Sequence, residues 1–125
     1  MADKLDSIFE EQGKLNKHIR ETKKSQGLGY EFSEKEWIDK LTTAMIEEAM
    51  EIKAHSNWKW WKKPKDLGRE DLKEEIVDLL HFWVALCLRL GISAEEIYDK
   101  YMEKNRENMS RQDKGHKSGH EGNDY

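Results

Sequence analysis

Apolar residues recur at helical spacing in two long segments of this chain, and this periodicity constrains its fold more than any other feature. At about 100° per residue, segments 37–52 and 72–90 each gather their apolar side chains on one face. The faces consist of Trp37, Ile38, Leu41, Met45, Ala49 and Ile52 in the first segment, and of Leu72, Ile76, Leu79, Trp83, Leu86 and Leu90 in the second. With one proline and little β-branched alternation, the chain is predicted to be all-α.

Helix starts and breaks predict four helices, within a fold class of four- to five-helix bundles. Ser33 and Ser93 each precede a glutamate by three residues, the capping-box spacing that supplies partners for free amides at a helix start. A proline and a glycine separate the two apolar segments, so the chain should leave the helix after about His55 and re-enter near Arg69.

Length and charge bound the domain organisation. The 125 residues suit one domain, which we assign to residues 1–110, followed by a polar, flexible tail at 111–125. A net charge of −4 argues against a binder of nucleic-acid polymers. The chain shows no signal-peptide pattern or membrane-length apolar run, so we expect a soluble, cytoplasmic protein without membrane contact. The lone Cys87 fits a small buried residue in a reducing compartment.

Two acidic pairs border the apolar faces: Glu48 with Glu51, and Glu75 with Asp78. Spacing alone does not select them, because eight acidic pairs in the chain stand three residues apart. Helical phase does select them, since Glu48 falls within its apolar face and the others lie along its edge or that of the second face, whereas Glu47 points away.

Converging carboxylates repel each other unless a cation pairs with them. Oxygen ligands without a cysteine or histidine set favour Mg²⁺, with Mn²⁺ as a substitute, and such ions commonly bridge carboxylates to substrate phosphates. The alternative is that these acids form ordinary surface pairs with lysines, as most charges in this chain must.

Amides and aromatic residues mark a second kind of candidate site. Gln12 and Asn16 interrupt the apolar stripe of the first predicted helix, where an amide can read the edge of a planar base or simply pair with another helix. Asn105 and Asn108 raise the same question in the fourth helix. Tryptophans alternate with lysines in 58–65, which offers either a stacking surface beside positive charge or a packing plug.

Together these residues resemble the all-α nucleoside triphosphate pyrophosphohydrolase superfamily, which includes MazG-like enzymes, and within it the dimeric dUTPase family. The superfamily pattern E-x-x-E followed by E-x-x-D matches the two acidic pairs. Three further segments resemble dimeric dUTPases, in the same order: Trp58-Lys-Trp-Trp-Lys62, Asp78-Leu-Leu-His-Phe82 and Lys104-Asn-Arg-Glu-Asn-Met-Ser-Arg-Gln112.

The resemblance implies a dimer and assigns roles to individual residues. It implies that Glu48, Glu51, Glu75 and Asp78 bind the metal, that Trp61, His81 and Phe82 line a uracil and deoxyribose pocket approached by Gln12 and Asn16, and that Lys104, Asn108 and Arg111 contact sugar and phosphates. His116 stands where an aromatic tyrosine is expected after Gly115, which weakens the expected closure over substrate.

With this resemblance, we expect a homodimeric enzyme that hydrolyses dUTP to dUMP and pyrophosphate, and the resemblance implies that dUDP is also accepted. Glu48 is the first choice for positioning or deprotonating the water. The nearest alternative is a MazG-like or dCTP-directed pyrophosphohydrolase. A di-iron bundle, suggested by Asp78-x-x-His81, lacks the second Glu-x-x-His that it needs. A non-catalytic dimer that docks a partner through its tryptophans is the most distant reading.

Overall fold

The computed structural model describes residues 2–115, and these residues form four α-helices and no strand. The helices are α1 (Lys4–Ser25), α2 (Glu34–Ala54), α3 (Arg69–Arg89) and α4 (Ala94–Asp113). Two compact units contain them: Met1–Gly91 holds α1 to α3, and Ile92–Tyr125 holds α4. The predicted all-α fold is confirmed.

Both helix starts predicted from serine are confirmed. At α2, the Glu36 backbone N–H donates to Ser33 Oγ at 3.2 Å, and the Ser33 N–H donates to the Glu36 carboxylate at 3.2 Å, which completes the capping box. At α4, the Glu96 N–H donates to Ser93 Oγ at 3.1 Å, but the Glu96 carboxylate accepts from the Ser93 hydroxyl instead of its backbone.

The side chain of Asn57 bridges the connection between α2 and α3 by hydrogen bonds to the backbone of Lys65. The Lys65 N–H donates to Asn57 Oδ1 at 2.8 Å, and Asn57 Nδ2 donates to the Lys65 carbonyl at 3.2 Å. Asn57 has a φ of 51°, a left-handed conformation that asparagine tolerates better than most residues. Since α2 ends at Ala54 and α3 begins at Arg69, the predicted break is confirmed.

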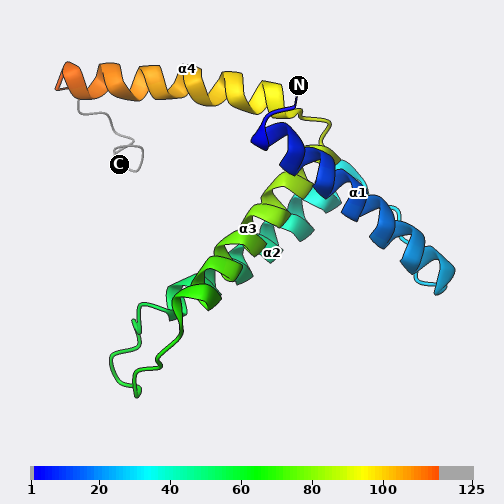
Figure 1. Cartoon of the computed structure of the whole chain (residues 1–125), viewed down its shortest axis with the longest axis horizontal. Helices are drawn as coiled ribbons and strands as arrows, with labels where there is room; N and C mark the ends of the chain where they lie inside the picture. The colour runs from blue at the N-terminus through cyan, green and yellow to red at the C-terminus, as the bar shows by residue number, and fades with distance from the viewer. Residues whose placement is uncertain (1, 116–125) are drawn as a thin grey trace. The chain divides into compact units, whose positions relative to one another are not determined.

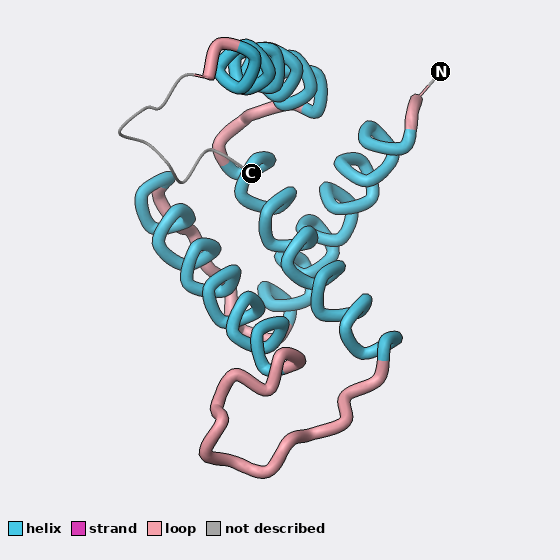
Figure 2. The backbone as a smooth tube through the Cα atoms, turned by 90° about the vertical axis from the view of Figure 1, so that its left-hand side faces the viewer, coloured by secondary structure: helices cyan, strands magenta, loops and turns pink. Residues whose placement is uncertain are grey.

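The α3 helix is central to the first unit. Figures 1 and 2 show α2 and α3 side by side and antiparallel, with α1 crossing α3. Val84 on α3 is fully buried, and the edge of the Phe9 ring on α1 meets Trp83 at a centroid distance of 6.3 Å. The buried apolar side chains in this unit are Phe9, Leu41, Val84, Ala85 and Cys87.

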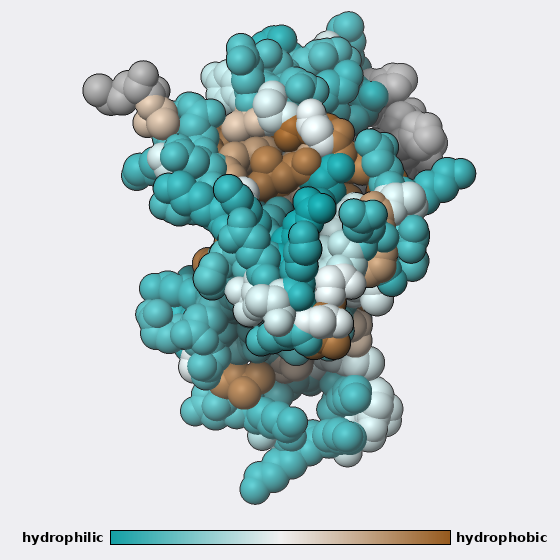
Figure 3. Space-filling view, turned by 90° about the vertical axis from the view of Figure 1, so that its right-hand side faces the viewer, coloured by the Kyte–Doolittle hydropathy of each residue, from teal (hydrophilic) through white to brown (hydrophobic). Residues whose placement is uncertain are grey.

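This core is small, and many large apolar side chains remain exposed. Figure 3 shows hydrophobic areas within a largely hydrophilic face of the molecule. On α3, Ile76, Val77 and Leu80 are exposed, although they belong to the helix that packs against both neighbours. A monomer of the described residues therefore leaves much apolar surface in contact with water.

Aromatic side chains of the loop between α1 and α2 pack against the first turn of α2. Tyr30 stacks on Phe32, both rings meet Trp37 edge to face, and the Arg89 guanidinium lies 4.1 Å from the centre of the Trp37 ring. Cation–π contact of this kind joins the start of α2 to the last turn of α3.

Cys87 is buried and unpaired, as predicted. Burial raises the pKa of the Cys87 thiol, which keeps it protonated and a poor nucleophile. Within the described ranges, no single helix is long and apolar enough to cross a membrane; α3 and α4 meet that test only as a bent pair, by length and composition.

The first residues of the expected tail belong to α4. The α4 helix continues to Asp113, so residues 111–113 of the expected tail are helical, and Lys114 caps the helix. Residues 116–125, including His116, lie outside the described residues.

Candidate functional site

Among the carboxylates of the described residues, Glu48 stands out by its buried oxygen and its raised pKa. Its Oε2 atom is buried and has no hydrogen-bond partner. Burial raises the pKa of Glu48, the close approach and charge of the Glu51 carboxylate raise it further, and the negative charges of Asp78 and Glu47 add to this. Because Glu51 lies on α2 and Asp78 on α3, members of both acidic pairs raise the pKa of Glu48.

Glu75 is held by a residue that the sequence analysis did not select. His55, the C-cap residue of α2, lies with its Nε2 atom 2.5 Å from Glu75 Oε2 on α3. The His55 side chain is only 9% exposed and that of Glu75 is 24% exposed. One sequence signal could have found His55: it follows Glu48 by seven residues, two helical turns, and so lies on nearly the same face.

The remaining acids are accessible. Glu51 and Asp78 are exposed, and Glu47 is exposed as helical phase predicts. As the side chains lie, the described residues contain no group of three or more His, Cys, Asp or Glu side chains arranged to hold a metal ion. The structure therefore brings Glu48, Glu51 and Asp78 into electrostatic contact, while Glu75 is engaged with His55.

The donor set nevertheless suits a divalent cation. An unpartnered buried carboxylate oxygen with a raised pKa is costly, and a cation supplies what it lacks. All four candidate ligands are carboxylates, the hard oxygen donors that Mg²⁺ accepts. Glu75 keeps its Oε1 atom for a ligand, because the contact with His55 is to Oε2.

Gln12, Asn16 and His81 meet in one hydrogen-bonded chain. His81 Nδ1 lies 2.7 Å from Gln12 Oε1 and is the donor, because an amide oxygen can only accept. Gln12 Nε2 then donates to Asn16 Oδ1 at 2.8 Å. Gln12 is only 7% exposed, and its amide finds hydrogen-bond partners inside the fold, His81 on α3 and Asn16 on α1.

This chain of amides borders an apolar cavity between α1 and α3. The cavity has a volume of about 270 Å³ and is lined by Ile8, Glu11, Gln12, Val77, Leu80 and His81. An apolar recess with a few convergent polar groups is the usual form of a small-molecule site.

The two aromatic candidates lie elsewhere. Phe82 is half-buried on α3 beside His81, and Trp61 is exposed in the connection, where it meets Trp58 and Trp60 edge to face. Neither lines the apolar cavity.

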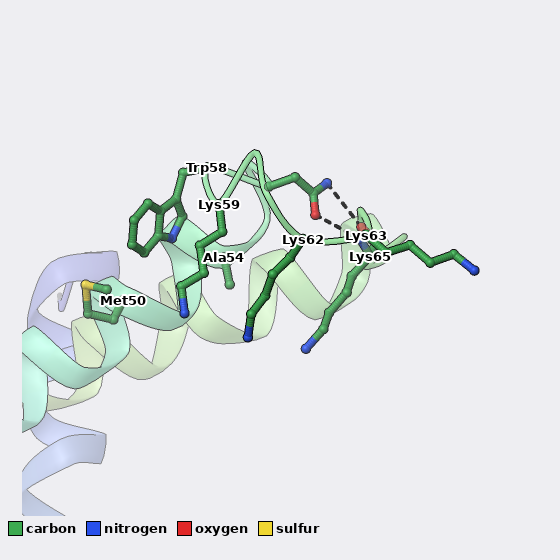
Figure 4. A pocket seen from close by; sticks show the side chains of 8 residues that line it. Met50, Ala54, Trp58, Lys59, Lys62, Lys63 and Lys65 are labelled. Carbon is green, nitrogen blue, oxygen red and sulfur yellow. Dashed lines mark hydrogen bonds between the residues drawn. The ribbon is translucent and has the colours of Figure 1, made fainter.

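The connection forms a basic pocket of its own, shown in Figure 4. This lysine pocket has a volume of about 210 Å³ and is lined by Met50, Ala54, Asn57, Trp58, Lys59, Lys62, Lys63 and Lys65. Met50 lies about 200° around α2 from Glu48, given 3.6 residues per turn. The lysine pocket and the buried carboxylate oxygen are therefore on different sides of α2.

The remaining candidates belong to the second unit. Lys104, Asn108 and Arg111 lie on α4, where Arg111 Nη1 donates to Asn108 Oδ1 at 3.5 Å, a long hydrogen bond. Asn108 and Arg111 are half-buried, and Lys104 is exposed.

The match to a family model covers mainly the first unit. A family model described as dUTPase matches residues 4–92, a range that ends before α4. Two curated relatives are named dCTP pyrophosphatase. That of Enterobacteria phage LZ5 is 41% identical over 78 residues, which cover 53% of this chain and 45% of that protein. That of Enterobacteria phage T4 is 36% identical over 78 residues, which cover 53% of this chain and 46% of that protein. The match thus spans less than half the length of either relative. No solved structure matches significantly.

Proposed function

Because this chain belongs to the all-α dUTPase family, we propose that it is a Mg²⁺-dependent nucleotide pyrophosphohydrolase that converts dUTP to dUMP and pyrophosphate and also accepts dUDP. The observation that carries this proposal is the buried, unpartnered oxygen of Glu48 beside the charges of Glu51 and Asp78.

Glu48, Glu51, Glu75 and Asp78 are the residues that would hold the metal. Bound there, Mg²⁺ would neutralise charge on the substrate phosphates and lower the pKa of a bound water. Glu48 would also position or deprotonate the attacking water, because its Oε2 atom is buried and has no hydrogen-bond partner in the described residues. This double role follows from its place between the apolar face and the acidic row.

The base would enter the apolar cavity between α1 and α3. Gln12 already uses its oxygen for His81 and one N–H for Asn16, which fixes the orientation of the Asn16 amide. Gln12 and His81 line this cavity, whereas Asn16 does not, so Asn16 would act on the base through Gln12. Uracil and cytosine both carry a carbonyl that one N–H donor can reach, so the choice of uracil rests on the match to the dUTPase family.

The alternative substrate is dCTP, because both curated relatives are named dCTP pyrophosphatase. A dCTP-directed enzyme would use the same carboxylates and would differ only where the base binds.

A nucleotide panel tests both the reaction and the base. Release of pyrophosphate from dUTP, dCTP, dTTP and UTP, with identified products and with or without Mg²⁺, should show Mg²⁺-dependent turnover of dUTP above the others. Glu48→Gln and Asp78→Asn should each lower turnover by about 10²-fold or more. Glu74→Gln is the matched control, since Glu74 is exposed on α3 and is not among the groups that raise the pKa of Glu48.

The outcomes separate the two substrates from a failure of the proposal. Preference for dCTP, with the same dependence on Glu48, would select the alternative. Full Mg²⁺-dependent turnover in both carboxylate variants, or no turnover of any nucleotide by a folded protein, would overturn the proposed reaction.

We also propose that the active form is a homodimer. Support comes from the small buried core and from exposed apolar side chains outside the apolar cavity, namely Ile46 on α2 and Ile76 on α3. Burial of such side chains against a second copy would supply the apolar contact that the described unit lacks.

A further inference from the structure

His55 joins the end of α2 to the second turn of α3. The residue is twenty positions from its partner Glu75 in the sequence, so this contact depends on how the two helices pack. The α2 helix ends at Ala54, and the His55 backbone N–H donates to the carbonyls of Ile52 and Lys53 as the helix closes. The cap fixes the backbone of His55, and burial restricts its ring.

The contact leaves Glu75 able to bind a second group. An ionised carboxylate only accepts hydrogen bonds, so the proton in the contact belongs to His55 Nε2. The carboxylate has two oxygens, and His55 engages Oε2 alone. A carboxylate held at one oxygen by a rigid donor presents the other in a fixed direction.

His55 also shares a face with the acidic pair of α2. Glu48, Glu51 and His55 follow one another at intervals of three and four residues, which places them along one stripe of α2. Glu75 and Asp78 form the corresponding pair on α3, and Asp78 acts on the pKa of Glu48. The contact between His55 and Glu75 thus stands at the end of the row that contains Glu48.

We propose that His55 is a positioning residue for the divalent-cation site, which orients the Glu75 carboxylate so that its Oε1 atom is available to the ion. This inference rests on the proposed function, because it takes Glu75 as a metal ligand. His55 itself stays outside the set of ligands. Loss of an outer hydrogen bond to a metal ligand commonly weakens metal binding by about 10–100-fold.

Metal binding without nucleotide gives the test. The full chain, freed of metal, is titrated with Mn²⁺ alone, and the free ion is followed by its electron paramagnetic resonance signal. The variants are His55→Leu, His55→Gln, His55→Asn and Glu75→Gln. His18→Leu is the matched control, because His18 is exposed on α1.

The result expected is a dissociation constant about 10–100-fold higher for His55→Leu than for the wild type, and an unchanged value for His18→Leu. His55→Gln should recover part of the loss, because its amide nitrogen can take the place of Nε2, whereas the shorter amide of His55→Asn should not. Far-UV circular dichroism shows whether each variant is folded. If His55→Leu is unfolded, the comparison of His55→Gln with His55→Asn decides.

Unchanged or tighter Mn²⁺ binding by a folded His55→Leu protein would overturn the role of His55, as would equal affinities of the glutamine and asparagine variants. A wild type that binds no Mn²⁺, or a Glu75→Gln variant that binds like the wild type, would instead remove the metal site on which the proposed function depends. The two failures therefore give different results.

Discussion

Glu48 shows how a single side chain can favour function over stability. Its buried oxygen lacks a partner, and Glu51 and Asp78 repel the charge that it would carry at neutral pH. Groups that destabilise a fold in this way are commonly found where a ligand compensates for them. The residues around Glu48 therefore favour a protein that is more stable when loaded with a cation.

Glu48→Gln should have opposite effects on thermal stability with and without Mg²⁺. The pKa of Glu48 is raised above 4.5 in the folded protein, so its ionisation destabilises the fold as pH rises through the folded-state pKa. Without metal, Glu48→Gln should melt at a higher temperature than the wild type at pH 8, and the difference should shrink as pH falls towards 4.5.

Saturating Mg²⁺ should raise the melting temperature of the wild type and have much less effect on Glu48→Gln, because the ion stabilises only the state that binds it. Thermal melts at several pH values, with Mg²⁺ or with a chelator, measure both effects. A Glu48→Gln protein that is less stable than the wild type without metal would contradict the role assigned to the buried charge.

Between elements, α1 and α3 are joined by polar as well as apolar contacts. The chain from His81 through Gln12 to Asn16 crosses from one helix to the other beside the apolar cavity. The sequence left open whether Gln12 and Asn16 pair with other helices or face a base. The structure shows that Gln12 pairs with His81 on α3, and that Asn16 pairs with Gln12 on its own helix.

Gln12→Ala should therefore weaken both the fold and the binding of substrate. The variant leaves His81 and Asn16 without their partner and opens space at a side chain that is 7% exposed, so we expect a loss of about 1–3 kcal/mol in the free energy of unfolding. The KM for dUTP should rise more than kcat falls, because the substitution removes base orientation and no carboxylate.

Urea unfolding and steady-state kinetics measure the two effects of Gln12→Ala. Lys17→Ala, at an exposed position of α1, serves as the control and should change stability by less than about 0.5 kcal/mol. Unchanged stability of Gln12→Ala would show that its hydrogen bonds do not contribute to the contact between α1 and α3.

At the scale of the whole molecule, the sequence predicted local structure better than long-range contacts. Helix bounds follow from neighbours in the chain, such as Ser33 at the start of α2 and Gly68 before α3, so they could be predicted. The contact between His55 and Glu75 depends on the packing of α2 against α3 and was missed, although helical phase put His55 near Glu48. The carboxylates were found, whereas their burial and pairing required the fold.

Association should make stability depend on concentration. If two copies cover the exposed apolar side chains outside the apolar cavity, such as Ile46 on α2 and Ile76 on α3, then dilution favours the less stable monomer. Melting temperature should rise with protein concentration between micromolar and hundred-micromolar samples, and sedimentation should show a dimer. Ile76→Lys should favour the monomer, whereas Lys35→Glu, at an exposed site near the start of α2, should not. A melting temperature that is independent of concentration, with a monomer in sedimentation, would contradict the dimer.

The connection between α2 and α3 also determines the intrinsic tryptophan fluorescence of this protein. Three of the five tryptophans of the chain lie in this connection, and Trp60 is 86% exposed. The other two are half-buried: Trp37 packs against Arg89, and Trp83 packs against Phe9. Exposed indoles dominate quenching by dissolved iodide, so most of the quenchable fluorescence comes from this one loop. Iodide quenching of tryptophan fluorescence therefore reports mainly on the loop that connects α2 to α3.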